Sequence, residues 1–287
     1  DIYVRFIDGA GNYSDQKGVT IKDTIILDTI GPKGEVKIND GKGYTNTQEI
    51  TLKLTADDGS GIGVDKMCFS NEGKNYSQWE SFQKVKSWSL SKVEDGPATV
   101  YVLYQDALSN ISEKALTASI LLDRKKPQGS FNITSRDGSR VFNQDTPANT
   151  IQVKINNLKL TDPGSGIEGI YLWNGAQTTP PDNAVYLKSS QFSAEQGIEW
   201  ELSTESGVQS VNMLVCDRAG NTSHCSYILR LDTTPPPSPD QESFRHTPNQ
   251  FGVSEEHTTI NFFWEATDNL RMIERFVGSY IIDGVEK

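Results

Sequence analysis

The sequence predicts an all-β protein built from tandem β-sandwiches, and two observations carry this prediction. First, apolar and polar residues alternate with a period of two through many short segments, whereas no segment keeps the period of 3.6 that marks an amphipathic helix. Second, several short strings recur in the same order about every 100 residues. We therefore expect repeats of about seven short strands joined by turns rich in Gly, Asn, Asp and Pro, which is the pattern of immunoglobulin-like or fibronectin type III-like sandwiches arranged as beads on a string.

Two of the recurring strings place an aspartate at the end of a strand. One is an Asp-x-x-x-Asn turn, in the segments YVRFIDGAGNYS, YVLYQDALSNIS and VNMLVCDRAGNTS, and its aspartates are Asp8, Asp106 and Asp217. The other is a strand that ends in Leu-Asp and runs into proline, and its aspartates are Asp28, Asp123 and Asp232. Both strings are typical of strand boundaries, because Asp and Pro favour turns.

Two further strings complete the repeat. An alternating strand runs into a turn in ITLKLTADDGSGI, LKLTDPGSGI and INFFWEATDNL, which contain Asp57 and Asp58, Asp162 and Asp268. A later strand carries one tryptophan, Trp88 in WSLS and Trp200 in WELS. We expect these two tryptophans to be buried in the cores of their repeats rather than to bind sugar.

The Leu-Asp strings divide the chain into four parts. Residues 1–28 are expected to be the C-terminal hairpin of a truncated repeat, 29–123 and 124–232 two complete repeats, and 233–287 the N-terminal part of another truncated repeat. The last part ends before the counterpart of the tryptophan strand. We therefore expect the sequence to be a window from a longer chain.

Composition and charge exclude several classes of function. There are 38 acidic and 27 basic residues, and a net charge of -11 disfavours binding to nucleic acid or to an anionic membrane. No apolar run approaches the roughly 20 residues of a membrane-spanning helix. The three histidines are well separated, and none of the usual catalytic motifs occurs. We therefore predict a soluble protein that is not an enzyme.

The strings Leu231–Pro236 (LDTTPP) and Asp8–Asn12 (DGAGN), together with the Gly-Ser-Gly-Ile turns, resemble the bacterial Ig-like repeats of large secreted and cell-surface proteins. The resemblance implies an extracellular or cell-surface location and a structural or adhesive role, as in adhesins, stalks and filaments. The partners it implies are neighbouring repeats of the same chain. Two alternatives are a module that binds a surface glycan or protein, and an accessory region of a secreted hydrolase.

Aspartates from three separate stretches are expected to meet at one end of each repeat. In an Ig-like sandwich the entering linker lies beside the B–C and F–G loops of its own repeat. The groups expected on this basis are Asp28, Asp57, Asp58 and Asp106; Asp123, Asp162 and Asp217; and Asp232 with Asp268. Clustered carboxylates repel one another, so Ca²⁺ with its 6–8 oxygen ligands is the candidate cofactor at these junctions. The alternative is that each aspartate only caps its own turn.

Cys216 and Cys225 flank the Asp-x-x-x-Asn turn of the second complete repeat. If the two strands pair so that these residues lie opposite each other, a cross-strand disulfide forms in an oxidising environment. The alternative is a reduced pair. Cys68 has no such partner in the sequence and is expected to be a packed strand residue.

Overall fold

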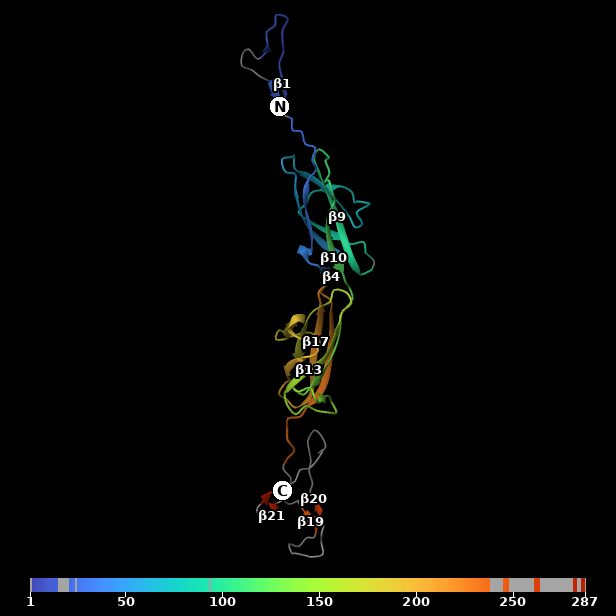
Figure 1. The fold of residues 1–287 in the computed structure, drawn as a ribbon, viewed down its shortest axis with the longest axis vertical. Helices are drawn as coiled ribbons and strands as arrows, with labels where there is room; N and C mark the ends of the chain where they lie inside the picture. Colours follow the sequence, from blue (N-terminus) through green and yellow to red (C-terminus); the bar gives the residue numbers. More distant parts are fainter. Residues whose placement is uncertain are drawn as a thin grey trace. The chain divides into compact units, whose positions relative to one another are not determined.

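The computed structural model describes residues 2–14, 21–23, 25–92 and 94–237, and further along the main chain of four short strands (Figure 1). The chain divides into two units, residues 1–125 with 218–220, and residues 126–217 with 221–287. The regular elements of the described part are strands and short 3₁₀ turns, so the all-β prediction is confirmed. None of its helical segments has the length and apolar character of a membrane-crossing helix. The four short strands are β19 (Arg245–Thr247), β20 (Asn261–Phe263), β21 (Ile281–Ile282) and β22 (Val285–Glu286).

The first unit contains a sandwich of two sheets over residues 33–122. One sheet has the order β3-β5-β8, with β3 (Lys33–Ile38), β5 (Glu49–Asp57) and β8 (Val85–Ser89). The other has the order β4-β10-β9-β6-β7, with β4 (Tyr44–Thr45), β10 (Leu116–Leu122), β9 (Gly96–Asp106), β6 (Val64–Ser70) and β7 (Glu80–Ser81). The turn η2 (Asn39–Gly41) follows β3, and β1 (Ile2–Val4) pairs with β2 (Ile21–Asp23) ahead of the sandwich.

The period-two pattern accounts for the core of this sandwich. In β5, Ile50, Leu52 and Leu54 are buried while the residues between them are exposed. They pack in one cluster with the inward side chains of β9, such as Val102 and Tyr104. Each fully buried side chain of this size contributes about 1.5–3 kcal/mol relative to an exposed one, so these alternating strands hold the two sheets together.

The second unit repeats this architecture over residues 128–231. One sheet has the order β12-β11-β13-β16, with β12 (Val141–Phe142), β11 (Gln128–Thr134), β13 (Gln152–Thr161) and β16 (Ile198–Glu201). The other has the order β15-β14-β17-β18, with β15 (Val185–Lys188), β14 (Ile167–Asn174), β17 (Gly207–Asp217) and β18 (Thr222–Leu231); the turn η3 (Ser189–Gln191) follows β15. The sandwiches are therefore tandem copies of one fold.

The two repeated tryptophans occupy equivalent places but are half-buried, which corrects the expectation of full burial. Trp88 on β8 pairs with Ile50, and Trp200 on β16 pairs with Val153. Both pack against the cores of their own sandwiches. The indole N–H keeps each ring at the rim, because it donates to an asparagine of the facing sheet: to Asn71 Oδ1 at 3.0 Å from Trp88, and to Asn174 Oδ1 at 2.7 Å from Trp200.

The predicted disulfide between Cys216 and Cys225 is wrong, and both thiols are free. The register of β17 and β18 pairs Cys216 with Thr222 and Cys225 with Met213, so the cysteines are not opposite each other. They also lie on different faces of the sheet. Cys225 packs against the core, whereas Cys216 follows the core residue Val215 and therefore points to the other side. A register that pairs Cys216 with Cys225 would require a longer turn between β17 and β18 than the one that is present.

Candidate metal site

The Asp-x-x-x-Asn turn after β9 is held by the carboxylate of Asp106. Its Oδ1 accepts the main-chain N–H groups of Leu108 and Asn110, both at 2.8 Å, and its Oδ2 accepts the Asn110 side-chain amide at 2.7 Å. The carboxylate is buried. Ser109 in this turn has a φ of 72°, the conformation that glycine adopts at the same position of the other two turns. Asp106 therefore caps its own turn, as the alternative prediction states. These hydrogen bonds do not use all of the carboxylate's lone pairs.

The loop after β5 brings a second carboxylate to the same place. Oδ2 of Asp58 accepts the N–H of Gly63 at 2.9 Å, while Oδ1 of Asp58 is buried and has no hydrogen-bond partner. Gly61 allows this packing, because a Cβ at that position would lie 2.3 Å from Asp58 Oδ2 and 2.5 Å from Asp28 Oδ2. The loop is thus closed around two carboxylates that leave no room for a side chain.

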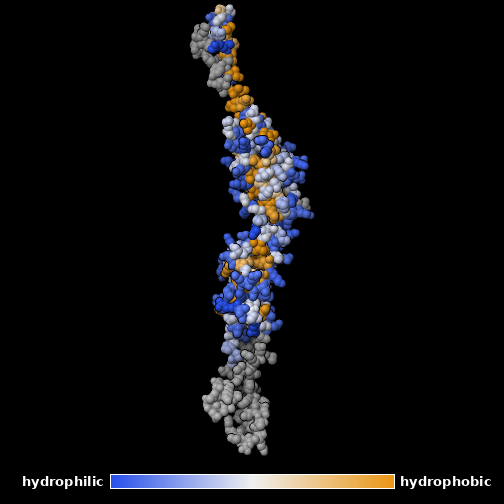
Figure 2. Space-filling view, viewed as in Figure 1, coloured by the Kyte–Doolittle hydropathy of each residue, from blue (hydrophilic) through white to orange (hydrophobic). Residues whose placement is uncertain are grey.

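The third carboxylate comes from the linker that precedes β3. Asp28 accepts the N–H of Ile30 at 3.2 Å and, on its other oxygen, the N–H of Ile62 at 3.3 Å. The Asn110 amide also donates to the main-chain carbonyl of Asp28 at 3.1 Å, so the linker is tied to both loops. Its apolar neighbours are exposed, and they form an orange stretch in Figure 2: Ile25, Ile26, Leu27 and Ile30.

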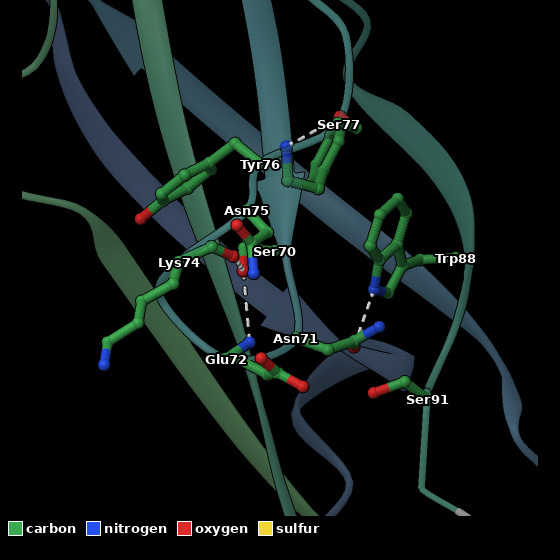
Figure 3. Close-up of a pocket in the computed structure, with 10 residues that line it drawn as sticks. Ser70, Asn71, Glu72, Lys74, Asn75, Tyr76, Ser77, Trp88 and Ser91 are labelled. Carbon is green, nitrogen blue, oxygen red and sulfur yellow. Dashed lines mark hydrogen bonds between the residues drawn. The ribbon is translucent and has the colours of Figure 1, made fainter.

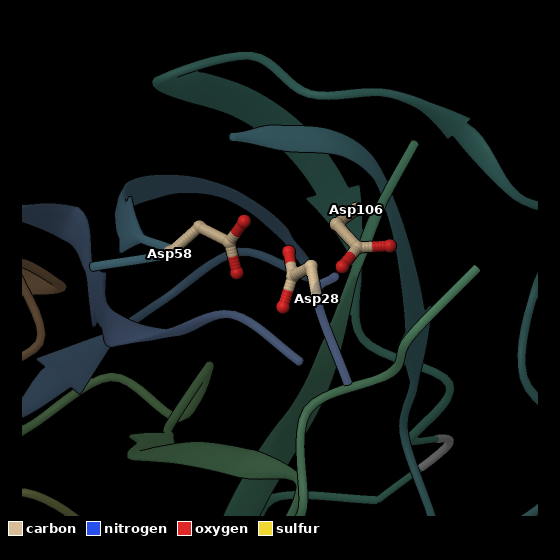
Figure 4. A group of neighbouring side chains, drawn as sticks. All are labelled: Asp28, Asp58 and Asp106. Atoms are coloured by element: carbon tan, nitrogen blue, oxygen red, sulfur yellow. The ribbon is translucent and has the colours of Figure 1, made fainter. Parts of the chain in front are cut away.

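These three residues converge as the sequence predicted. One carboxylate oxygen from each of Asp28, Asp58 and Asp106 lies within 4.8 Å of the others (Figure 4). Within the described part of the chain, no lysine or arginine forms an ion pair with any of the three. Three negative charges at this separation repel, and one oxygen among them is buried without a donor. A hard cation that prefers oxygen ligands fits both features.

The second sandwich repeats two parts of this arrangement. Asp217, buried at the end of β17, accepts the main-chain N–H and the side-chain amide of Asn221, both at 2.8 Å. Asp162, in the loop after β13, accepts the N–H of Gly166 at 2.6 Å on Oδ2, while its Oδ1 is buried without a partner. An oxygen of Asp162 lies within 4.8 Å of one from Asp217. The same orphaned oxygen therefore occurs twice in the molecule.

The other predicted aspartates have different surroundings. Asp57 is exposed and accepts the N–H of Gly59 at 3.0 Å, so it caps its own turn and stays outside the cluster. Asp123, in the first unit, is buried and accepts the N–H of Lys125 at 3.2 Å. Asp232 accepts the N–H of Thr234 at 3.2 Å. The turns at Asp123 and Asp232 therefore have the same hydrogen bond as the turn at Asp28. Asp268 lies outside the described residues.

Burial and hydrogen bonding act in opposite directions on the pKa of Asp106. Burial raises this pKa, but the hydrogen bonds from the side chain and main chain of Asn110 and from Leu108 lower it by more, so the net pKa is below the ordinary value. The pKa of Asp8 is also lowered, mainly by the side-chain amide of Asn12. Both carboxylates are therefore ionised at neutral pH, which is the state a cation binds.

Sequence reasoning missed three contributors. Asn110 ties the linker to the turn, and Gly61 makes room for two carboxylates. Asn71 and its counterpart Asn174 accept the indole N–H groups of the two repeated tryptophans. The recurrence of Asn in the turn string was visible, as was the glycine in the loop. Which groups these residues contact, however, depends on the tertiary structure.

No protein-family model matches this chain, and no curated protein matches its sequence. Solved structures to which the chain is similar include the fibronectin(III)-like modules of CbhA from Clostridium thermocellum (11% identity, 69% of this chain and 94% of that chain, TM-score 0.42). Others are the FN1–FN3 domains of chicken CNTN1 (13% identity, 79% and 77%, TM-score 0.37) and a Ca²⁺-stabilised adhesin with which an Antarctic bacterium binds ice (17% identity, 80% and 55%, TM-score 0.38).

Proposed function

We propose that this chain is a non-catalytic, extracellular rod or stalk segment of a structural or adhesive surface protein, with linkers stiffened by Ca²⁺. The observation that carries the proposal is the buried, unpartnered Oδ1 of Asp58, which lies in a group with the carboxylates of Asp28 and Asp106. A buried carboxylate oxygen without a donor is costly, and a bound cation removes that cost.

Calcium suits the donor set better than a smaller or softer ion. All three side chains offer oxygen: Asp28 lies in the linker, Asp58 in the loop after β5, and Asp106 at the last residue of β9, where the turn begins. Ca²⁺ accepts 6–8 oxygen ligands in flexible geometry, and main-chain carbonyls and water complete the shell in such sites. Extracellular modules bind Ca²⁺ with dissociation constants of about 10⁻⁴–10⁻³ M, which suits the medium outside cells.

The mechanical consequence follows from where the ligands originate. Asp28 belongs to the linker, whereas Asp58, in the loop after β5, and Asp106, at the end of β9, belong to the sandwich that the linker enters. A cation bound to all three cross-links the linker to its own sandwich and removes the freedom of the intervening residues. The segment then transmits force and direction along the chain instead of bending at each linker.

The same proposal extends to the next linkers by sequence equivalence. Asp123 is the counterpart of Asp28 and has the same local turn, so we propose that it completes the pair Asp162 and Asp217. Asp232 stands at the corresponding place ahead of the last part of the chain, where Asp268 is the counterpart of Asp58. One cation per linker is the expected stoichiometry for a complete repeat.

The test is calorimetry on the full chain in 10 mM Ca²⁺ and in chelator. At about 10–100 times the dissociation constant, each site stabilises its sandwich by about 1.4–2.7 kcal/mol, so the melting transitions should rise with calcium. Asp58→Asn should abolish the rise for the first sandwich. In chelator the same variant should melt slightly higher than the native chain, because it removes one of three repelling charges.

The matched control is Asp57→Asn, which alters the adjacent residue outside the cluster. It should keep the full calcium response. Identical melting of the native chain with calcium and with chelator would refute the calcium part of the proposal. Small-angle scattering on the same samples tests the mechanical part, because bound calcium should narrow the distribution of end-to-end distances.

A further inference from the structure

The first sandwich has a pocket at the end of β6 that the proposed rod function does not use. It has a volume of about 320 Å³, in the lower part of the range for small-molecule sites, about 300–1,000 Å³. Aromatic and polar side chains line it together: Trp88, Tyr76, Glu72, Lys74, Asn75 and Ser91. In Figure 3, the rings of Tyr76 and Trp88 lie on the left and on the right of the view, and the Glu72 carboxylate lies below them, near Asn71.

Two serines fix the main chain of this loop. Ser70 Oγ accepts the N–H of Glu72 at 3.1 Å and donates to the carbonyl of Lys74. Ser77 Oγ accepts the N–H of Phe69 at 3.0 Å and donates to the carbonyl of Gln78 at 3.2 Å. The loop is therefore held at both ends, and a ligand would meet side chains on a backbone that is already ordered.

The polar groups at the pocket are available to a ligand. Among the described residues, the side chains of Glu72, Lys74 and Asn75 make no hydrogen bond or ion pair. The indole N–H of Trp88 is already satisfied by Asn71 at 3.0 Å, so this residue presents ring surface rather than an unpaired donor. The pocket thus combines an aromatic wall with a carboxylate, an amide, an ammonium and hydroxyl groups.

This combination matches an uncharged sugar. A sugar ring has an apolar face that packs on an aromatic ring, and its hydroxyls both donate and accept hydrogen bonds, as carboxylate and amide groups require. Glu72 and Lys74 have opposite charges, so the pocket offers no single sign of charge, and the net charge of -11 disfavours acidic polysaccharides. We propose that the loop between β6 and β7, with Trp88, binds a short stretch of uncharged glycan.

The second sandwich provides an internal contrast. It keeps the tryptophan and its asparagine, Trp200 and Asn174, in the same arrangement. The segment that follows Asn174 is different, because 10 residues (175–184) separate it from β15 and include two consecutive prolines, and the indole N–H of Trp173 donates to Gln177 in it. The pair of tryptophan and asparagine is thus shared by the two sandwiches, whereas the loop between β6 and β7 that lines the pocket belongs to the first.

The experiment uses the full chain on an array of uncharged oligosaccharides that includes both polysaccharide fragments and N-linked glycans, so that the bound spots identify the source. Calorimetric titration with the oligosaccharide bound most strongly then compares three variants. Glu72→Ala and Asn75→Gly should each weaken binding about tenfold, the effect of losing one charged or bidentate hydrogen-bonding group. Asn75→Gly suits the backbone, because Asn75 has a φ of 50°.

The matched control is Glu195→Ala, which removes an exposed carboxylate from a loop of the second sandwich. It should leave the affinity unchanged, and all variants should melt like the native chain. Binding to no glycan on the array would overturn the proposal. An affinity that stays the same in Glu72→Ala and Asn75→Gly, or that falls equally in Glu195→Ala, would also overturn it. Calcium is irrelevant to these outcomes, so the result is independent of the proposed rod function.

Discussion

The turns at Asp8 and Asp106 have the same internal geometry and different surroundings. In the first, Asp8 Oδ1 accepts the N–H groups of Ala10 and Asn12 at 2.9 Å, and Oδ2 accepts the Asn12 amide at 2.9 Å. Asp106 makes the corresponding bonds at 2.8, 2.8 and 2.7 Å. Yet Asp8 is exposed, whereas Asp106 is 1% exposed and meets two further carboxylates. Local hydrogen bonding therefore builds the turn, and only the sandwich around it builds a candidate metal site.

This contrast also separates two roles that one residue can have. A carboxylate that caps a turn is satisfied by its own loop, as Asp8 is. A carboxylate that additionally faces Asp28 and Asp58 has repulsion to offset, as Asp106 does.

The largest effect is expected from Asp106→Ala in chelator. It leaves two main-chain N–H groups and the Asn110 amide without their acceptor in a buried place, so the melting temperature of the first sandwich should fall by about 10–15 °C. Asp8→Ala exposes the same donors to water and should change that transition by less than about 2 °C. Differential scanning calorimetry measures both. Equal losses would mean that the surroundings of the turn do not matter.

A smaller effect is expected from Gly61→Ala. The added Cβ would overlap the carboxylates of Asp58 and Asp28, so the loop must shift, and we expect a loss of about 5 °C in chelator. The calcium response should fall as well, because two ligands move. Gly43→Ala is the control, since a Cβ there meets nothing within 4 Å. A calcium response that survives Gly61→Ala unchanged would argue against a cation bound between Asp28 and Asp58.

The smallest effect is expected from pH. Folding lowers the pKa of Asp106, so the unfolded chain binds more protons once the pH nears the unfolded value of about 3.9. The stabilisation from this carboxylate is therefore complete well above that pH and is lost as the pH falls through the folded pKa. The difference in melting temperature between the native chain and Asp106→Asn, measured in chelator, should shrink as the pH is lowered from 5 to about 2. A constant difference would show that ionisation of Asp106 contributes nothing.

Much of the fold was predictable from the sequence because its causes are local and repeated. The alternation of Ile50, Leu52 and Leu54 specifies which face of β5 is buried, since successive side chains of a strand point to opposite sides. The Asp-x-x-x-Asn strings specify hairpin turns, because the aspartate caps its own loop. The recurrence of both in one order indicated tandem copies of a sandwich.

Part of the candidate site was predictable as well, since the connectivity of the sandwich places the linker beside two loops. The sequence could not separate Asp57 from Asp58, because adjacent residues of an irregular loop point in directions that only its packing determines. It also could not place Cys216 and Cys225, since the length of the turn determines the register and a shift of one residue exchanges the faces of a strand.

The sequence by itself thus determined the strands, the turns and the repeated fold, which depend on interactions within a few residues or on a period along the chain. The tertiary structure alone decided which carboxylates lie close together, which asparagine accepts the indole N–H of each repeated tryptophan, and which loop lines a pocket. The physical reason is that these features join residues such as Asp28 and Asp106, which are far apart in the sequence and are brought together only when the two sheets bury their apolar faces against each other.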